Sequence, residues 1–124
     1  NPYAQAGLYG QCTWFAWGRF YELYGHDPGF SGDGSNCVKE LVAAHPDKFE
    51  RSSSPKAGAV FSAIGHNHVG IVIAVKDNTI TVQEGNLDGI TNTFQDAKKD
   101  WQTKSYTLDQ LRSIYGGVVF ANPK

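Results

Sequence analysis

The hydrophobic repeat changes along the chain, and this change constrains the fold more than any other feature. Between residues 12 and 24, aromatic residues recur at spacings of three or four, at Trp14, Trp17 and Tyr21, which is the period of one helix face. From residue 59 onward, Val, Ile and Thr follow the two-residue period of strands. Helices followed by strands predict an α+β fold, and the helical spacing favours Trp14 and Trp17 as core residues.

Local signals set the expected elements. We expect a helix over 12–24 that ends at Gly25, and a second helix from Asn36, its expected N-cap, to Ala44, before Pro46. The stretch "TLDQLRSIYG" opens with a Thr-x-x-Gln capping box and predicts a short helix. The segment "RSSSPKAG" is predicted to form a polar turn, and a strand is expected within 89–104. The other strands are expected at 59–63, 68–75, 79–86 and "GVVFA" near the end.

Length and charge narrow the function classes. The 124 residues are expected to form a single domain, 1–124, excised from a larger modular protein because the chain begins abruptly at Asn1 without a Met or a signal sequence. The formal net charge of −1 makes nucleic acid an unexpected partner. No apolar run approaches the roughly 20 residues of a membrane helix, so no membrane insertion is expected.

Cys12 stands at the first turn of the expected first helix, where backbone N–H groups and the helix dipole stabilise negative charge. Such a position favours a thiolate nucleophile. A buried structural cysteine is the alternative that position alone leaves open. The chain holds two cysteines and no Cys-x-x-Cys pair, which argues against a structural zinc ribbon. Cys37 is expected to be structural and free, because a disulfide to Cys12 would disable that thiol.

A nucleophilic cysteine needs a base, and the pairing of two expected strands offers one. If "KDN" at 76–78 forms a three-residue hairpin turn, Val75 faces Thr79, Val72 faces Val82, Ala74 lies against Ile80, and His68 faces Asn86. Glu84 then lies diagonally from His68 on the same face, within side-chain reach. A buried carboxylate needs a partner, and a His–Glu hydrogen bond would also fix the imidazole tautomer.

Four segments in this order, "GQCTWFAWGR", "AGAVFS", "HVGIV" and "VQEGN", resemble the CHAP domain, a cysteine, histidine-dependent amidohydrolase/peptidase. The resemblance implies a papain-like α+β fold related to the NlpC/P60 group, with N-terminal helices packed on a curved antiparallel β-sheet. It also implies hydrolysis of an amide bond in peptidoglycan through a thioester. The enzyme would be an endopeptidase or an N-acetylmuramoyl-L-alanine amidase. The protein that contains the domain would be a phage lysin or a bacterial autolysin.

Carried over by motif, the resemblance assigns the nucleophile to Cys12, the general base to His68, the orienting acid to Glu84 and the accompanying amide to Asn86. The Cys12 backbone N–H and a second donor, Gln11 or Tyr9, would stabilise the oxyanion. His66 does not match a family position and is expected near the groove. Phe30 and Trp101 are the candidates for aromatic groove residues.

The expected partner is bacterial peptidoglycan, of Gram-positive type, met at the cell wall by a secreted or phage-encoded monomer linked to a wall-binding or second catalytic domain. No cofactor is expected. Some phage CHAP domains bind calcium before the nucleophile, but "NPYAQAGLYGQC" contains no carboxylate, so no calcium is predicted there. Two alternatives stay open. One is a non-catalytic wall-binding module, and the other is a metal site formed by Cys12, His66 and His68.

Overall fold

A computed structural model describes residues 12–65, 68–84 and 102–124. Helices and strands occur in the order that the change of hydrophobic period predicts, with the first two α-helices before the first strand. In chain order the elements are α2 (Cys12–Tyr24), η1 (Gly34–Asn36, one 3-10 turn), α3 (Cys37–Ala44), β1 (Phe49–Ser52), β2 (Val60–Ala63), β3 (His68–Lys76), β4 (Thr79–Glu84), β5 (Gln102–Thr107), α5 (Leu108–Tyr115) and β6 (Val118–Pro123).

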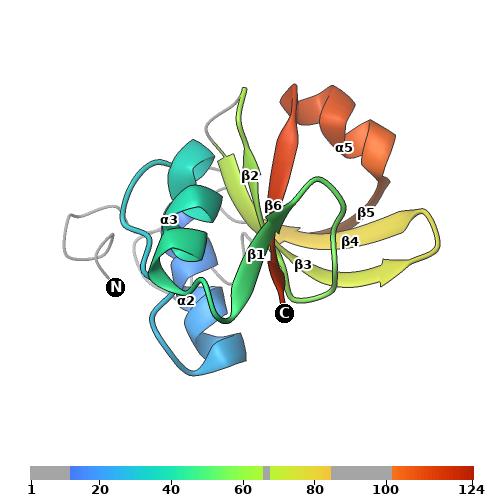
Figure 1. Ribbon diagram of the computed structural model, residues 1–124. Helices are drawn as coiled ribbons and strands as arrows, with labels where there is room; N and C mark the ends of the chain where they lie inside the picture. The colour runs from blue at the N-terminus through green and yellow to red at the C-terminus, as the bar shows by residue number, and fades with distance from the viewer. Residues whose placement is uncertain (1–11, 66–67, 85–101) are drawn as a thin grey trace.

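The strands form one six-stranded sheet in the order β1-β6-β2-β3-β4-β5, and every neighbouring pair is antiparallel. The last strand, β6, therefore lies between β1 and β2. Helices α2 and α3 lie together beside the sheet, whereas α5 lies apart from them near β5 and β6 (Figure 1). This arrangement is the predicted α+β fold. No helix within the described ranges has the length and hydropathy to span a membrane.

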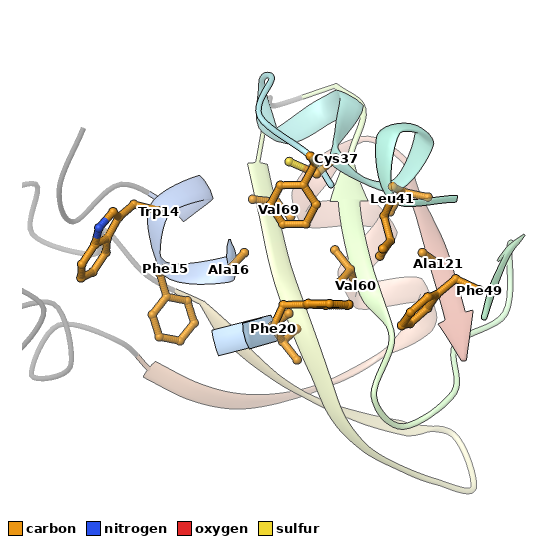
Figure 2. Packing of buried hydrophobic residues seen from close by; sticks show 13 residues of the cluster. Trp14, Phe15, Ala16, Phe20, Cys37, Leu41, Phe49, Val60, Val69 and Ala121 are labelled. Carbon is orange, nitrogen blue, oxygen red and sulfur yellow. The ribbon is translucent and has the colours of Figure 1, made fainter. Parts of the chain in front are cut away.

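The two faces of the sheet carry separate hydrophobic cores, because successive strand residues point to opposite sides. Val60 packs with α2 and α3, while its neighbour Phe61 packs toward α5. On the first face, Phe20 of α2 and Phe49 of β1 have ring centroids 5.5 Å apart, and Figure 2 shows both rings close to Val60. Trp14 is buried and Trp17 is partly buried against this core, as the predicted stripe requires, but Tyr21, the third residue of the stripe, is 50% exposed.

The ends of the helices follow the sequence signals only in part. Gly25 terminates α2 with φ 73° and donates its N–H to Tyr21 O at 2.8 Å, as expected. Asn36 does precede α3, but it has helical backbone angles and no side-chain cap, because the turn η1 leads directly into the helix. The polar segment around residue 51 was expected to be a turn, yet Phe49–Ser52 forms β1 on the edge of the sheet.

The β3–β4 hairpin corrects one half of the predicted register and confirms the other half. Next to the turn, Lys76 pairs with Thr79, so the loop holds two residues and Ala74 lies opposite Thr81, not against Ile80. The register then shifts by one residue between Val72 and Ala74, which is a β-bulge. Beyond it Val72 pairs with Val82 as predicted. The shorter turn and the bulge cancel, and the far end of the hairpin keeps the predicted alignment.

Helix α5 has both ends fixed by hydrogen bonds. The predicted capping box is present: the Thr107 side chain accepts from the Gln110 N–H at 3.1 Å, and the Thr107 N–H donates to Gln110 Oε1 at 2.9 Å. At the other end, Gly116 adopts φ 72° and donates its N–H to Arg112 O. These two caps fix where α5 begins and ends, and so they fix the position of its last residue, Tyr115.

Candidate active site

His68 and Glu84 meet at the end of the β3–β4 hairpin, on the face of the sheet that packs against α5. His68 Nε2 lies 2.9 Å from Glu84 Oε1. The Glu84 side chain is only 1% exposed and the His68 side chain is 18% exposed. Because a carboxylate only accepts hydrogen bonds, Nε2 must carry a proton. The diagonal contact that strand periodicity predicted is therefore present in the structure.

Cys12 reaches this pair from a different part of the chain. It is the first residue of α2, which packs on β3, and its thiol lies near enough to His68 to raise the pKa of that imidazole. Since Nε2 of His68 is bound to Glu84, Nδ1 is the nitrogen that remains to face the thiol. The Cys12 side chain is partly exposed and packs on the edge of the core beneath α2. A thiol, an imidazole and a carboxylate thus lie in series.

The surroundings of His68 favour its protonated form. Burial by itself would lower the pKa of His68, but the hydrogen bonds and the charges of Cys12 and Glu84 raise this pKa to about 9. The imidazolium is therefore the stable form at neutral pH, since its ordinary pKa is 6.5. An imidazolium beside a thiol is the arrangement that stabilises a thiolate.

Tyr115 is a member of this cluster that the sequence prediction missed. Its hydroxyl donates a hydrogen bond to Glu84 Oε1, the same oxygen that contacts His68. Its ring stacks on the His68 imidazole, with centroids 5.0 Å apart and an interplanar angle of 18°. Burial, the hydrogen bond to Glu84 and the charge of Glu84 together raise the pKa of Tyr115 well above its usual value. The phenol therefore keeps its proton and remains a hydrogen-bond donor at neutral pH.

Phe61 of β2 forms a further wall of the His68 site. Its ring centroid lies 6.0 Å from that of His68 and 6.1 Å from that of Tyr115. Gly70 of β3 pairs with Phe61 across the strands, and a Cβ at Gly70 would come within 2.5 Å of the Phe61 ring and 2.9 Å of Gln83 O. The glycine in "HVGIV" is therefore needed for the close approach of this ring.

The remaining predicted residues divide into two groups. Phe30, predicted as a groove residue, is instead 1% exposed in the core under α2, so that prediction is wrong. Cys37 is buried and forms no disulfide with Cys12, as expected, and its Sγ donates to Asp33 O at 3.4 Å. Five predicted residues lie outside the described ranges, and their roles stay predictions: Tyr9, Gln11, His66, Asn86 and Trp101.

A metal site of the kind left open by the sequence would need His66, which lies outside the described ranges. Among the residues that the structure does describe, no group of three or more His, Cys, Asp or Glu side chains could hold a metal ion.

Fold and site together define an α+β domain with a thiol at a helix N-terminus and a His–Glu pair on an antiparallel hairpin. The family model of the CHAP domain matches residues 2–86. This match covers more than half of the chain, so the chain belongs to the CHAP domain family. It includes Cys12, His68 and Glu84 but ends before Tyr115. No curated protein matches the sequence.

One solved structure shows the same fold, and a second aligns over less of the chain. An N-acetylmuramoyl-L-alanine amidase from Staphylococcus aureus aligns with a TM-score of 0.61 and 21% identity, over 93% of this chain and 31% of its own. The chain thus spans about a third of the length of that amidase. Ly7917 bound to the hydrolysis product of MDP aligns with a TM-score of 0.49 and 21% identity, over 75% of this chain and 38% of its own.

Proposed function

We propose that this domain hydrolyses an amide bond of bacterial peptidoglycan, with Cys12 as the nucleophile and a thioester as the intermediate. The observation that carries the proposal is the series Cys12, His68 and Glu84, in which the carboxylate hydrogen-bonds the imidazole and the nearby thiol raises the pKa of the same imidazole. Membership of the CHAP domain family supports the reaction class. The name of the Staphylococcus aureus amidase, which has the same fold, agrees with this substrate class.

The geometry suits each step of acyl transfer. His68 holds the proton of Cys12 as an ion pair, and the thiolate attacks the carbonyl carbon of the amide. Cys12 lies in the first turn of α2, where backbone N–H groups lack a carbonyl partner within the helix, so its N–H is proposed to donate to the oxyanion. Gln11 or Tyr9 is proposed as the second donor. His68 then protonates the leaving amine, and with His68 as base, water hydrolyses the thioester.

Glu84 keeps the imidazole in the orientation and tautomer that these steps need, because it binds Nε2 and leaves Nδ1 toward the thiol. Asn86, two residues further along the chain, is proposed to accompany it. His66 is proposed to lie near the bound substrate. No step requires a metal ion or an organic cofactor.

The wider context is part of the same proposal. The scissile bond is either the muramoyl–alanine amide or a peptide bond of the stem or crossbridge, which makes the domain an amidase or an endopeptidase. The substrate is proposed to be Gram-positive peptidoglycan at the cell wall. Residues 1–124 are proposed to act as one monomeric catalytic domain of a secreted autolysin or phage lysin, linked to a wall-binding or second catalytic domain.

Mass spectrometry of digested peptidoglycan tests the proposal. Purified walls with several crossbridge types are incubated with the wild type, with Cys12→Ala and with the matched variant Cys37→Ala, which alters the buried cysteine outside the site. New fragments are expected with the wild type and with Cys37→Ala but not with Cys12→Ala, and their termini identify the bond.

Two other results would count against thiol catalysis. Fragments from Cys12→Ala would show that Cys12 is not the nucleophile. Stable binding to every wall without any fragment would favour the non-catalytic wall-binding module.

A further inference from the structure

The proposed mechanism gives roles to Cys12, His68 and Glu84, but it does not use Tyr115. This side chain is partly buried, contacts two members of the series and comes from α5, an element that lies beyond the segment matched by the family model.

We propose that Tyr115 is a positioning residue for His68, acting through its hydroxyl on Glu84 and through its ring on the imidazole plane. The inference rests on the proposed thiol mechanism for its catalytic consequence. The structural part, a controlled orientation and basicity of His68, can be measured without any substrate.

The hydroxyl acts on the charge of Glu84. A carboxylate that is 1% exposed receives little help from water, so its charge must be balanced by protein donors. Oε1 receives one donor from His68 and another from Tyr115. The second hydrogen bond stabilises the ionised carboxylate and makes it a weaker base. The proton between Nε2 of His68 and Glu84 therefore stays on Nε2 and does not move to the carboxylate.

The ring acts on the orientation of His68. The stacked Tyr115 ring covers one side of the imidazole, and the tilted Phe61 ring contacts it from another direction at an interplanar angle of 57°. Rotation of the imidazole about its Cβ–Cγ bond would break the Glu84 hydrogen bond and lose this stacking. The two effects together hold Nε2 on Glu84 and Nδ1 toward Cys12.

The backbone around Tyr115 is built to support such a role. Tyr115 ends α5 immediately before the left-handed Gly116. The neighbouring Gly117 O accepts the Ile64 N–H at 3.0 Å, and a Cβ at Gly65 would lie 3.1 Å from Tyr115 O. The end of α5 therefore packs against Ile64 and Gly65, which follow β2 and precede His68 in the chain.

The test compares Tyr115→Phe, Tyr115→Leu and the control Tyr106→Phe by NMR titration of the His68 imidazole, with no substrate present. Tyr106 senses the charge of Glu84 but donates no hydrogen bond to it among the described contacts. Without the Tyr115 hydroxyl, the negative charge of Glu84 loses one hydrogen-bond donor and acts more strongly on His68. The His68 titration should then move upward by about one pH unit, the equivalent of one charged hydrogen bond.

Hydrolysis of peptidoglycan is measured on the same proteins. Tyr115→Phe should lower kcat roughly tenfold, since a less acidic imidazolium protonates the leaving amine more slowly. Tyr115→Leu should lower kcat further, while Tyr106→Phe leaves both readouts unchanged. An unchanged His68 titration in Tyr115→Phe would overturn the inference. A shifted titration in a protein that cleaves no wall would support the positioning role and reject the proposed function instead.

Discussion

At the scale of single residues, the site depends on how a buried carboxylate is balanced. Glu84 is almost fully buried, and its hydrogen bonds to His68 and Tyr115 replace the water that it would otherwise bind. The contact with Glu84, together with the nearby Cys12, raises the pKa of His68 to about 9. Structure and protonation state are therefore set by the same few atoms.

The variant Glu84→Gln tests this link through pH. In the wild type, the imidazolium persists at neutral pH because the pKa of His68 is raised above 6.5, so activity should fall as pH rises through about 9. Glutamine removes the charge, the pKa of His68 falls, and the alkaline limit of activity should move to lower pH with a loss of roughly tenfold or more in kcat. Rates of wall hydrolysis between pH 6 and pH 10 measure both effects.

Glu22→Gln is the matched control, because Glu22 is exposed and pairs with Arg19 on the surface of α2. This variant should keep the wild-type profile. An alkaline limit that stays in place in Glu84→Gln would show that His68 does not owe its protonation to Glu84.

Gly70 provides a prediction about packing beside the site. In Gly70→Ala the new methyl group would lie 2.5 Å from the Phe61 ring and 2.9 Å from Gln83 O. Because of this clash, the free energy of unfolding should fall by about 1–3 kcal/mol. Urea denaturation measures the change. The double variant with Phe61→Leu should lose less than the sum of the two single variants, and simple additivity would argue against the clash.

Sequence reasoning reached His68 and Glu84 because strand periodicity relates residues that are close in sequence. Tyr115 is 31 residues from Glu84, on a helix whose position depends on how the chain returns to the sheet. No period in the sequence encodes that contact. The end of "TLDQLRSIYG" was visible as a helix terminus, but the direction of its last side chain follows only from the packing of α5 against β5 and β6. Phe30 was misassigned for a related reason, since a loop position does not reveal burial.

At the scale of elements, the hairpin shows how a correctly predicted contact between His68 and Glu84 arose from a partly wrong register. The loop was predicted one residue too long and the bulge was not predicted, and these errors cancel at Val72 and Val82. A two-residue hairpin loop requires a positive φ, and Asp77 adopts φ 55° here. Asp tolerates this conformation better than most residues, so the sequence favours the short loop. The strand β1 was missed because four residues with one buried position carry almost no periodic signal.

Helix α5 gives the prediction at this scale. Thr107→Ala removes the side-chain half of the capping box, so the free energy of unfolding should fall by about 1 kcal/mol. Ser113→Ala, on the exposed side of the same helix, is the control and should be neutral or slightly stabilising. Thermal unfolding of both variants measures the difference. Equal stability of Thr107→Ala and the wild type would mean that the capping box adds nothing in this protein.

At the scale of the whole molecule, the site joins three parts of the chain that fold onto one sheet. The N-terminal helix α2 brings the thiol, the central hairpin brings the imidazole and the carboxylate, and α5 brings the phenol. The two cores on opposite faces hold these parts in place. The α+β class and the order of elements followed from the change in hydrophobic period. The position of β6 between β1 and β2 did not, because pairing between distant strands leaves no local pattern.

The alkylation rate of Cys12 by iodoacetamide at pH 7, compared between the wild type and His68→Ala, is the most direct test of the central claim that Cys12 and His68 act as one ion pair. Only the thiolate reacts, so His68→Ala should be alkylated roughly tenfold more slowly. Cys37, which is fully buried, should stay unmodified in both folded proteins and serves as the internal control in mass spectra. Equal rates of Cys12 alkylation in the two proteins would contradict the claim.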